Sequence, residues 1–287
     1  MTANERPLSY VIPQGKPRRW PAIRDRVRNF VLAPFYWAYQ RRLEAAVATW
    51  KLPHHIGIIM DGNRRYARRL GFENVNQGHL SGAQKLWEVL EWCYDLGVPL
   101  VTVWSFSLEN FEREIGEVGA LLQLFEEKTK ELAEHEEVHA KQVRVRYLGQ
   151  IERLPDGLQA AIRAAEEITA SYERFQLNIA MAYGGRQEIA EAFRRYLRDK
   201  AAGGVSIDQV IEQFEDRSIE PYLYTSGQPE PDLILRTSGE IRLGGFLLWQ
   251  SAYSEFYFCE TNWPALRKID LLRALRSYHE RHRRLGR

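Results

Sequence analysis

Three short segments of the chain carry side chains that commonly bind phosphate and metal ions. The first reads DGNRRYARR. Asp61 could hold a hard cation such as Mg²⁺, and Gly62 would let the backbone approach a ligand closely. Asn63 is suited to cap a following helix, while the guanidinium groups of Arg64 and Arg65 match phosphate oxygens. The segment fits a Mg²⁺–diphosphate site, although its spacing alone fits a solvent-exposed helix start equally well.

The other two segments contain similar groups. Ser107 and Asn110 stand beside Arg113 in SFSLENFER, a pattern that by itself is typical of an ordinary strand-to-helix turn. Arg236 and Arg242 occur with two hydroxyl residues and three glycines in RTSGEIRLGG, which suits a second phosphate cluster. Because the chain contains neither GxxxxGK(S/T) nor GxGxxG, we expect a phosphate-binding fold other than the usual nucleotide-binding ones.

One further motif indicates a different chemistry. His135 and His139 fit the HExxH pattern, which in zinc peptidases places two histidine ligands and a general base on one helix face. The surrounding residues are polar on all sides, whereas such a helix is normally packed in a core. A zinc metallopeptidase is therefore kept as an alternative that tightly bound zinc would support.

Composition restricts the class of protein. The chain has 287 residues, two cysteines and a net charge of +2, so it needs no disulfide scaffold and is not a polycation that binds nucleic acid. We find no apolar run long enough to span a bilayer and no hydrophobic signal core. We expect a cytoplasmic protein.

The elements that must position these segments alternate along the chain. Apolar runs rich in Ile and Val predict buried strands, and helical spacing predicts helices between them, including 80–96 and 264–284. This alternation predicts an α/β fold, a mostly parallel central sheet flanked by helices, with ligands bound beyond the carboxyl ends of the strands. The expected strands are 55–60, 100–106, 143–148, 175–183, 232–236 and 253–258.

The first 50 residues differ from the rest. They contain nine Lys and Arg against three acidic residues. We expect a helix over 22–48 that carries an aromatic patch. Such a helix either lies on an anionic membrane surface or packs on the body or a partner subunit. We therefore divide the chain into a basic arm, 1–51, and one catalytic domain, 52–287. The patch consists of Phe30, Phe35, Tyr36, Trp37 and Tyr39.

Five segments in order resemble the cis-prenyltransferases, the undecaprenyl diphosphate synthase-like family. They cover most of the chain from His54 onward: HHIGIIMDGNRRYARRLG, GHLSGAQKLWEVLEWCYDLGV, SFSLENFER, AMAYGGRQEI and PDLILRTSGEIRLGGFLLWQSAYSEFYFCETNWP. The resemblance implies a single-domain homodimer with an apolar tunnel for the prenyl chain. It also implies an Mg²⁺-dependent enzyme that condenses isopentenyl diphosphate with geranyl or farnesyl diphosphate and makes a Z double bond.

Residue roles follow from the same resemblance. Asp61 would engage Mg²⁺ and the departing diphosphate, and Glu255 would be a Mg²⁺ ligand that completes the neighbouring subunit's site. Asn110 would be catalytic, although an amide alone is a poor proton acceptor. The C-terminal segment 284–286 would reach phosphate across the dimer. The residues implied to bind substrate are Gly62, Asn63, Arg64, Arg65, Tyr66, His79, Ser107, Leu108, Glu109, Phe111, Arg113, Arg236, Arg242, Leu243 and Gly244.

Some positions depart from the family pattern. Arg64 stands where the family usually has glycine, and Gly244-Gly245 replaces the more usual Ser-Asn, so that only backbone amides can serve there. The sequence does not fix product length, and Trp87, Trp92 and Trp104 are candidates for narrowing the tunnel. A catalytically silent lipid-binding subunit is a second alternative, which the presence of the expected catalytic residues disfavours.

Overall fold

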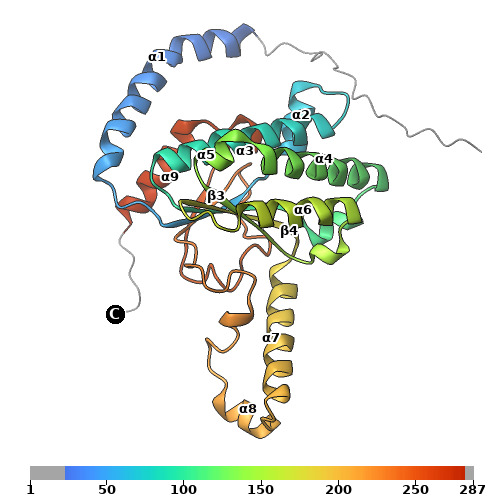
Figure 1. Cartoon of the computed structure of the whole chain (residues 1–287). Coiled ribbons are helices and arrows are strands. Elements are labelled where there is room, and N and C mark those ends of the chain that lie inside the picture. Colours follow the sequence, from blue (N-terminus) through green and yellow to red (C-terminus); the bar gives the residue numbers. More distant parts are fainter. Residues whose placement is uncertain (1–22, 282–287) are drawn as a thin grey trace, which may run out of the picture.

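A six-stranded parallel sheet forms the centre of the computed structural model, which describes residues 23–281 (Figure 1). Each expected strand is present to within two residues, in the spatial order β3-β4-β2-β1-β5-β6. Strands β1 and β5 are buried along their whole length, as expected when both faces of a parallel sheet are covered. The strands are β1 (His55–Ile59), β2 (Leu100–Ser107), β3 (Val143–Leu148), β4 (Phe175–Tyr183), β5 (Leu233–Arg236) and β6 (Glu255–Phe258).

Helices alternate with the strands, as the sequence predicted. The larger core joins one face of the sheet to α3, α4, α6 and α9, and a smaller core on the other face packs Phe246 and Leu247 against Ile59 and Ile234. The helices are α1 (Ile23–Ala46), α2 (Asn63–Leu70), α3 (Asn76–Asp95), α4 (Ile115–Glu134), α5 (Glu136–Ala140), α6 (Asp156–Thr169), α7 (Gly185–Ala202), α8 (Ile207–Gln213) and α9 (Lys268–Glu280).

The last helix is shorter than predicted. A 3₁₀ turn over Trp263–Ala265 precedes it, so α9 begins at Lys268 rather than at Pro264. It ends at Glu280, and the remainder of the expected helix lies partly outside the described residues.

The end of α1 packs on the body of the molecule. Leu43 contacts Ile269 and Leu272 of α9 in a small apolar cluster. Phe35 and Trp37, by contrast, are 71% and 64% exposed; the side chain of Phe30 lies outside the described part. Across residues 23–281, none of the helices combines the length and apolar character needed to cross a membrane.

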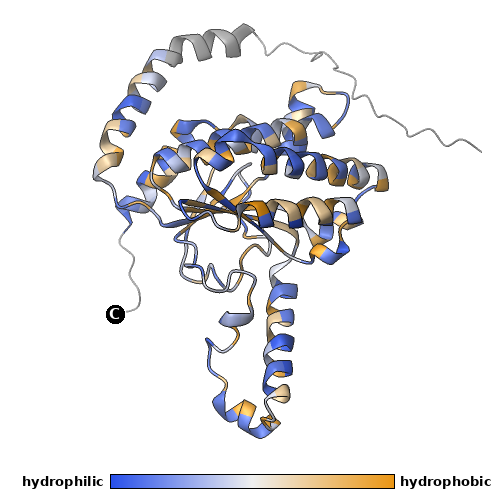
Figure 2. Ribbon diagram, in the orientation of Figure 1, coloured by the Kyte–Doolittle hydropathy of each residue, from blue (hydrophilic) through white to orange (hydrophobic). Residues whose placement is uncertain are grey.

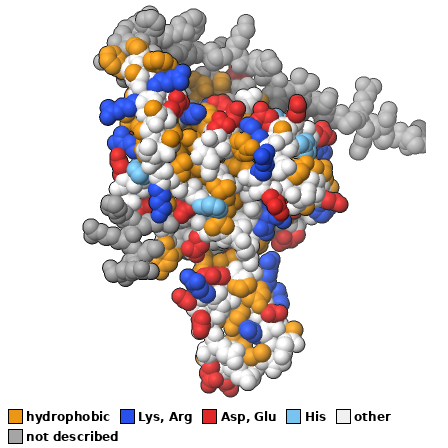
Figure 3. All heavy atoms as spheres, turned by 60° about the vertical axis from the view of Figure 1, so that its left-hand side comes forward, with side chains coloured by type: hydrophobic (Ala, Val, Ile, Leu, Met, Phe, Trp, Pro, Cys, Tyr) orange, Lys and Arg blue, Asp and Glu red, His pale blue; other side chains and the backbone are white. Residues whose placement is uncertain are grey.

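Helices α7 and α8 extend away from the sheet (Figure 1). Hydrophilic and hydrophobic residues alternate in bands along α7 (Figure 2). Tyr196 of α7 and Val210 of α8 are buried in one small apolar cluster with Ile219, while Ile207 and Ile211 remain exposed. In the space-filling view, hydrophobic patches lie among charged side chains on this projecting segment (Figure 3).

Candidate active site

A polar cleft of about 650 Å³ opens at the carboxyl ends of β1, β2 and β5. Parallel strands bring the residues that follow them to one edge of the sheet, so segments far apart in the chain meet here. Thirteen of the predicted site residues line the cleft: Asp61, Gly62, Asn63, Arg64, Arg65, His79, Ser107, Glu109, Asn110, Arg113, Arg236, Arg242 and Gly244.

Four residues predicted to bind substrate do not line this cleft. Tyr66 packs edge-on against Phe72, and Leu108 is buried in the main core. Phe111 packs at right angles on another core phenylalanine, and Leu243 joins the small core on the opposite face of the sheet. Their apolar side chains are used in packing, because burial of apolar surface outweighs any placement at a polar cleft.

Asp61 and Arg236 form the centre of the cleft. Arg236 Nη2 donates to Asp61 Oδ2 at 2.7 Å, and Arg236 Nη1 donates to the carbonyl of Arg242. The backbone carbonyl of Asp61 accepts from Thr237 Oγ1 at 2.7 Å and from the Trp263 amide at 3.0 Å. Hydrogen bonds to both the backbone and the side chain of Asp61 therefore hold its carboxylate in place.

The backbone turn after β1 requires glycine. Gly62 has φ +104°, and a Cβ there would lie 2.6 Å from Asn262 Oδ1. Gly62 itself is the N-cap of α2, so the prediction that Asn63 caps this helix is wrong. Asn63 is the first helical residue instead, and its side chain lies against α3, where a Cβ on Gly82 would approach Asn63 Oδ1 to 2.4 Å. A glycine on α3 thus lets the turn after β1 pack closely against this helix.

Glu240 links the two arginine-rich segments. Its carboxylate accepts hydrogen bonds from both Arg65 and Arg242, and Arg65 also donates to the carbonyl of Ser238 at 2.8 Å. The hydrogen bond from Arg65, together with the nearby Arg242, lowers the pKa of Glu240. The arginines of α2 and of the loop after β5 are consequently held together at one side of the cleft.

Glu117 links two other arginines on the opposite side of the cleft. It lies 3.1 Å from Arg113 and 3.8 Å from Arg64. His79 is close to this group, and burial together with the positive charge of Arg113 lowers its pKa to about 4. His79 is therefore neutral near neutral pH.

Several polar atoms of the cleft have no protein partner among residues 34–281. They are Asn63 Oδ1, His79 Nε2, Trp104 Nε1 and Arg236 Nε. A buried polar atom without a partner costs about 1–3 kcal/mol. Four of them at one cleft fit a site that is completed by a polar ligand.

Asn110 lies at the end of β2, in the 3₁₀ turn Leu108–Glu112. Its side-chain oxygen accepts a hydrogen bond of 3.1 Å from the amide of Ser107. This hydrogen bond fixes the turn and occupies the oxygen of the side-chain amide. The amide neither gains nor loses a proton near neutral pH.

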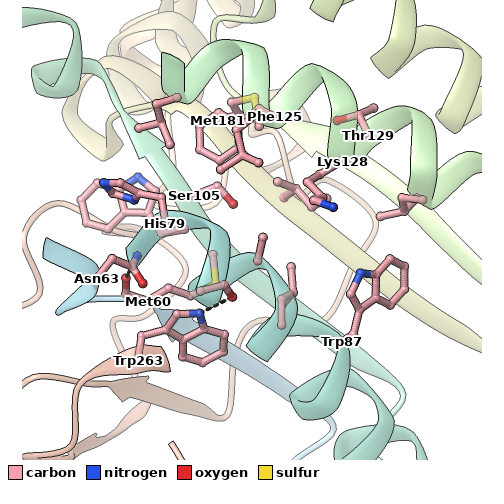
Figure 4. A pocket seen from close by; sticks show the side chains of 18 of the residues that line it. Met60, Asn63, His79, Trp87, Ser105, Phe125, Lys128, Thr129, Met181 and Trp263 are labelled. Atoms are coloured by element: carbon pink, nitrogen blue, oxygen red, sulfur yellow. Dashed lines mark hydrogen bonds between the residues drawn. The ribbon is translucent and has the colours of Figure 1, made fainter. Parts of the chain in front are cut away.

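An apolar cavity of about 100 Å³, here named the proximal cavity, continues from the cleft where the tunnel was expected. It lies between α3 and α4 and shares Met60, Asn63, His79, Trp104, Ser105 and Leu121 with the cleft. Figure 4 shows His79 and Asn63 at one end and Trp87 at the other. Trp87 and Trp104 line it as predicted, whereas Trp92 does not and has Lys85 near its ring instead.

Glu255 is not near Asp61 in a single chain. It begins β6 and pairs with Leu233, the first residue of β5, so it lies at the opposite edge of the sheet from the cleft. Its carboxylate accepts from Arg281 Nη1 at 2.7 Å. The segment 284–286 lies outside the described residues.

The two histidines of the HExxH pattern have different partners. His135 is the N-cap of α5 rather than a member of its helical turns, and its ring stacks on Trp87. His139 Nδ1 lies 2.9 Å from Tyr172 Oη. In residues 34–281 we find no cluster of three or more His, Cys, Asp or Glu side chains that could hold a metal ion. The geometry does not favour a zinc peptidase.

The sequence interpretation missed one charged residue of the cleft. Arg68 lines the cleft together with Arg64. The two are four residues apart on α2, and residues at this spacing lie on one helix face. That spacing is the signal that could have predicted Arg68.

Comparison with known proteins agrees with this geometry. A family model described as putative undecaprenyl diphosphate synthase matches residues 59–286. An isoprenyl transferase of Thermus thermophilus is 50% identical over 254 residues, which cover 88% of this chain and 96% of the relative. A tritrans,polycis-undecaprenyl-diphosphate synthase (geranylgeranyl-diphosphate specific) of Methanopyrus kandleri is 49% identical over 89% of this chain and 93% of its own length.

A solved structure is similar as well. Lavandulyl diphosphate synthase from Lavandula x intermedia, crystallised with dimethylallyl diphosphate, superposes with a TM-score of 0.75 at 34% identity. The match covers 82% of this chain and 99% of that one. The chain therefore belongs to the undecaprenyl diphosphate synthase family and is a prenyltransferase.

Proposed function

We propose that this prenyltransferase condenses isopentenyl diphosphate with an allylic diphosphate, geranyl or farnesyl diphosphate, and forms a new Z double bond with the help of Mg²⁺. The observation that carries the proposal is the continuity of a cationic cleft with an apolar cavity. A diphosphate head and a hydrocarbon tail need these two environments side by side. The arginines of the cleft are Arg64, Arg65, Arg68, Arg113, Arg236 and Arg242.

Both diphosphates would bind in this cleft. Gly62, Asn63, Arg64 and Arg65 would hold the allylic diphosphate, with His79 beside it. Arg236, Arg242 and the backbone amide of Gly244 would hold isopentenyl diphosphate. Fixing two anions next to each other converts a bimolecular reaction into one within a complex, which accounts for much of the rate.

The donor set at Asp61 fits Mg²⁺. This ion takes one or two carboxylates and completes its octahedron with phosphate oxygens and water. Asp61 supplies one carboxylate on the wall of the cleft, and Glu255 would come from a neighbouring subunit. When bound, Mg²⁺ would supply Lewis-acid stabilisation of the charge on the departing diphosphate.

In the reaction, the double bond of isopentenyl diphosphate attacks the allylic carbon, the carbon–oxygen bond to diphosphate breaks, and one proton leaves the new chain. The arginines stabilise the negative charge of the leaving group. The proton goes to water or to the released diphosphate, since Asn110 Oδ1 already accepts a backbone hydrogen bond. The proximal cavity receives the growing tail.

Incubation of the protein with radiolabelled isopentenyl diphosphate, Mg²⁺ and geranyl or farnesyl diphosphate tests the proposal. Chromatography should detect longer prenyl diphosphates, and NMR of the product should show the new double bond as Z. A folded protein that consumes neither substrate would contradict the proposal and would support a catalytically silent subunit.

The subunit arrangement is part of the proposal. We infer a cytoplasmic homodimer in which a catalytic domain, 52–287, follows the arm 1–51 and the arm contacts a membrane surface. The position of Glu255 away from Asp61 and the exposure of Phe35 and Trp37 support it. Light scattering would measure the mass, and vesicle sedimentation would measure membrane contact.

A further inference from the structure

A second cavity lies beyond the proximal one. It has a volume of about 250 Å³, more than twice that of the proximal cavity, and we name it the distal pocket. Both occupy the space between α3 and the α4–α5 pair. The proximal cavity uses the carboxyl-terminal parts of the strands, for example Met181, and the distal pocket uses their amino-terminal parts, for example Val143 and Phe175.

Two side chains separate these cavities. Trp87 and Leu132 are the residues that line both. The ring of His135 stacks on Trp87 from the distal side, with centroids 4.4 Å apart and planes 17° apart. The break between α4 and α5 at His135 turns this ring toward α3. Figure 4 places Trp87 at the far end of the proximal cavity from His79.

We propose that the Trp87–His135 stack closes the prenyl tunnel and thereby sets the length of the product. This inference rests on the proposed condensation reaction. A tail that grows from the cleft along α3 meets the indole of Trp87 before it can enter the distal pocket. Beyond the stack, the distal pocket is lined by apolar side chains such as Leu90, Val138 and Leu177, which could take up further hydrocarbon if the stack were removed.

Trp87→Ala tests this directly, because it removes the larger part of the partition and joins the two cavities. Its products from farnesyl diphosphate should be longer than those of the wild type by whole isoprene units. Trp92→Ala is the matched control: Trp92 is a partly buried tryptophan on the same helix that lines neither cavity. The control should keep the wild-type product distribution.

His135→Asn provides a second variant that should fold normally. His135 is exposed and caps α5, and asparagine keeps a capping side chain while it removes the stacked ring. We expect a smaller shift to longer products than for Trp87→Ala. Unchanged product lengths in both variants, with an active wild type, would overturn the inference. An inactive, folded wild type would instead refute the proposed reaction itself.

Discussion

Arg236 Nη2 lies 2.7 Å from Asp61 Oδ2, and this contact joins residues that the sequence assigned to two different phosphate sites. The side chain of Arg236 is only 6% exposed, whereas that of Asp61 is 31% exposed. Loss of the carboxylate would leave a buried guanidinium without its charged partner, which is costly. The pair therefore matters both for the fold of the cleft and for its charge balance.

Asp61→Asn should test both contributions. The amide oxygen can still accept from Arg236, but the negative charge is lost. We expect turnover to fall by a factor of about 10²–10³, as for other removals of a charge-stabilising group. The urea unfolding midpoint should fall as well, because the buried guanidinium of Arg236 keeps a hydrogen bond but loses the charge that balanced it. Turnover close to the wild-type value with Mg²⁺ would contradict the role of Asp61.

Arg236→Gln should weaken the binding of isopentenyl diphosphate. Hydrogen bonds to charged groups are each worth about 1.5–3 kcal/mol, so the KM for this substrate should rise about tenfold or more. Arg217→Gln is the control, since Arg217 is 81% exposed and lies 3.8 Å from Glu220, and such surface pairs contribute little. Equal KM values in the two variants would refute the assignment.

His79 should make stability depend on pH. Its pKa is lowered to about 4 by burial and by Arg113, so below the ordinary value of 6.5 the unfolded chain takes up a proton that the native state does not. Stability is then complete above about pH 6.5 and declines as the pH falls toward 4. Urea unfolding between these pH values should show a shallower decline for His79→Asn. His55, whose pKa is also about 4, is present in both proteins and contributes the same pH dependence to each. If the free energy of unfolding fell equally with pH in the wild type and the variant, His79 would make no contribution.

Glu188 should act as a positioning residue for the loop that carries Gly244. Its carboxylate accepts from the Tyr224 amide at 3.0 Å, from Gln250 Nε2 at 2.9 Å and from Tyr183 Oη, which in turn accepts from the Leu247 amide. Glu188→Ala leaves buried donors without a partner and should lower the free energy of unfolding by about 1–3 kcal/mol.

The KM for isopentenyl diphosphate should rise in the same Glu188 variant, because the loop loses its support. Glu191→Ala is the control: Glu191 lies about one turn later on α7 and pairs with surface arginines, so its loss should change neither quantity. A stable Glu188→Ala protein with a normal KM would show that the buried network does not hold the loop.

Metal removal distinguishes the proposed chemistry from the zinc alternative. EDTA should abolish condensation, and added Mg²⁺ should restore it, because the cleft supplies a carboxylate and arginines. A zinc-selective chelator should leave the rate unchanged. Inhibition by that chelator, reversed by Zn²⁺, would indicate that His135 or His139 has a role beyond its aromatic contact.

The fold could be predicted well because its signals are local. Largely buried runs such as 100–106 are apolar enough to identify a strand, and parallel topology then brings their carboxyl ends together. The cap of α2 was predicted wrongly because the left-handed conformation of Gly62 lets the helix begin one residue early. The stack of His135 on Trp87 joins residues far apart in sequence, and no local pattern could indicate it.

The Glu240 bridge has a consequence for how readily substrates are captured. With Arg65 and Arg242 already anchored to one carboxylate, both long side chains have given up much of their rotamer freedom before any anion arrives. That entropy loss is borne during folding rather than at the moment of association. The cleft is thus preorganised, and more of the intrinsic attraction for an incoming anion is retained as affinity.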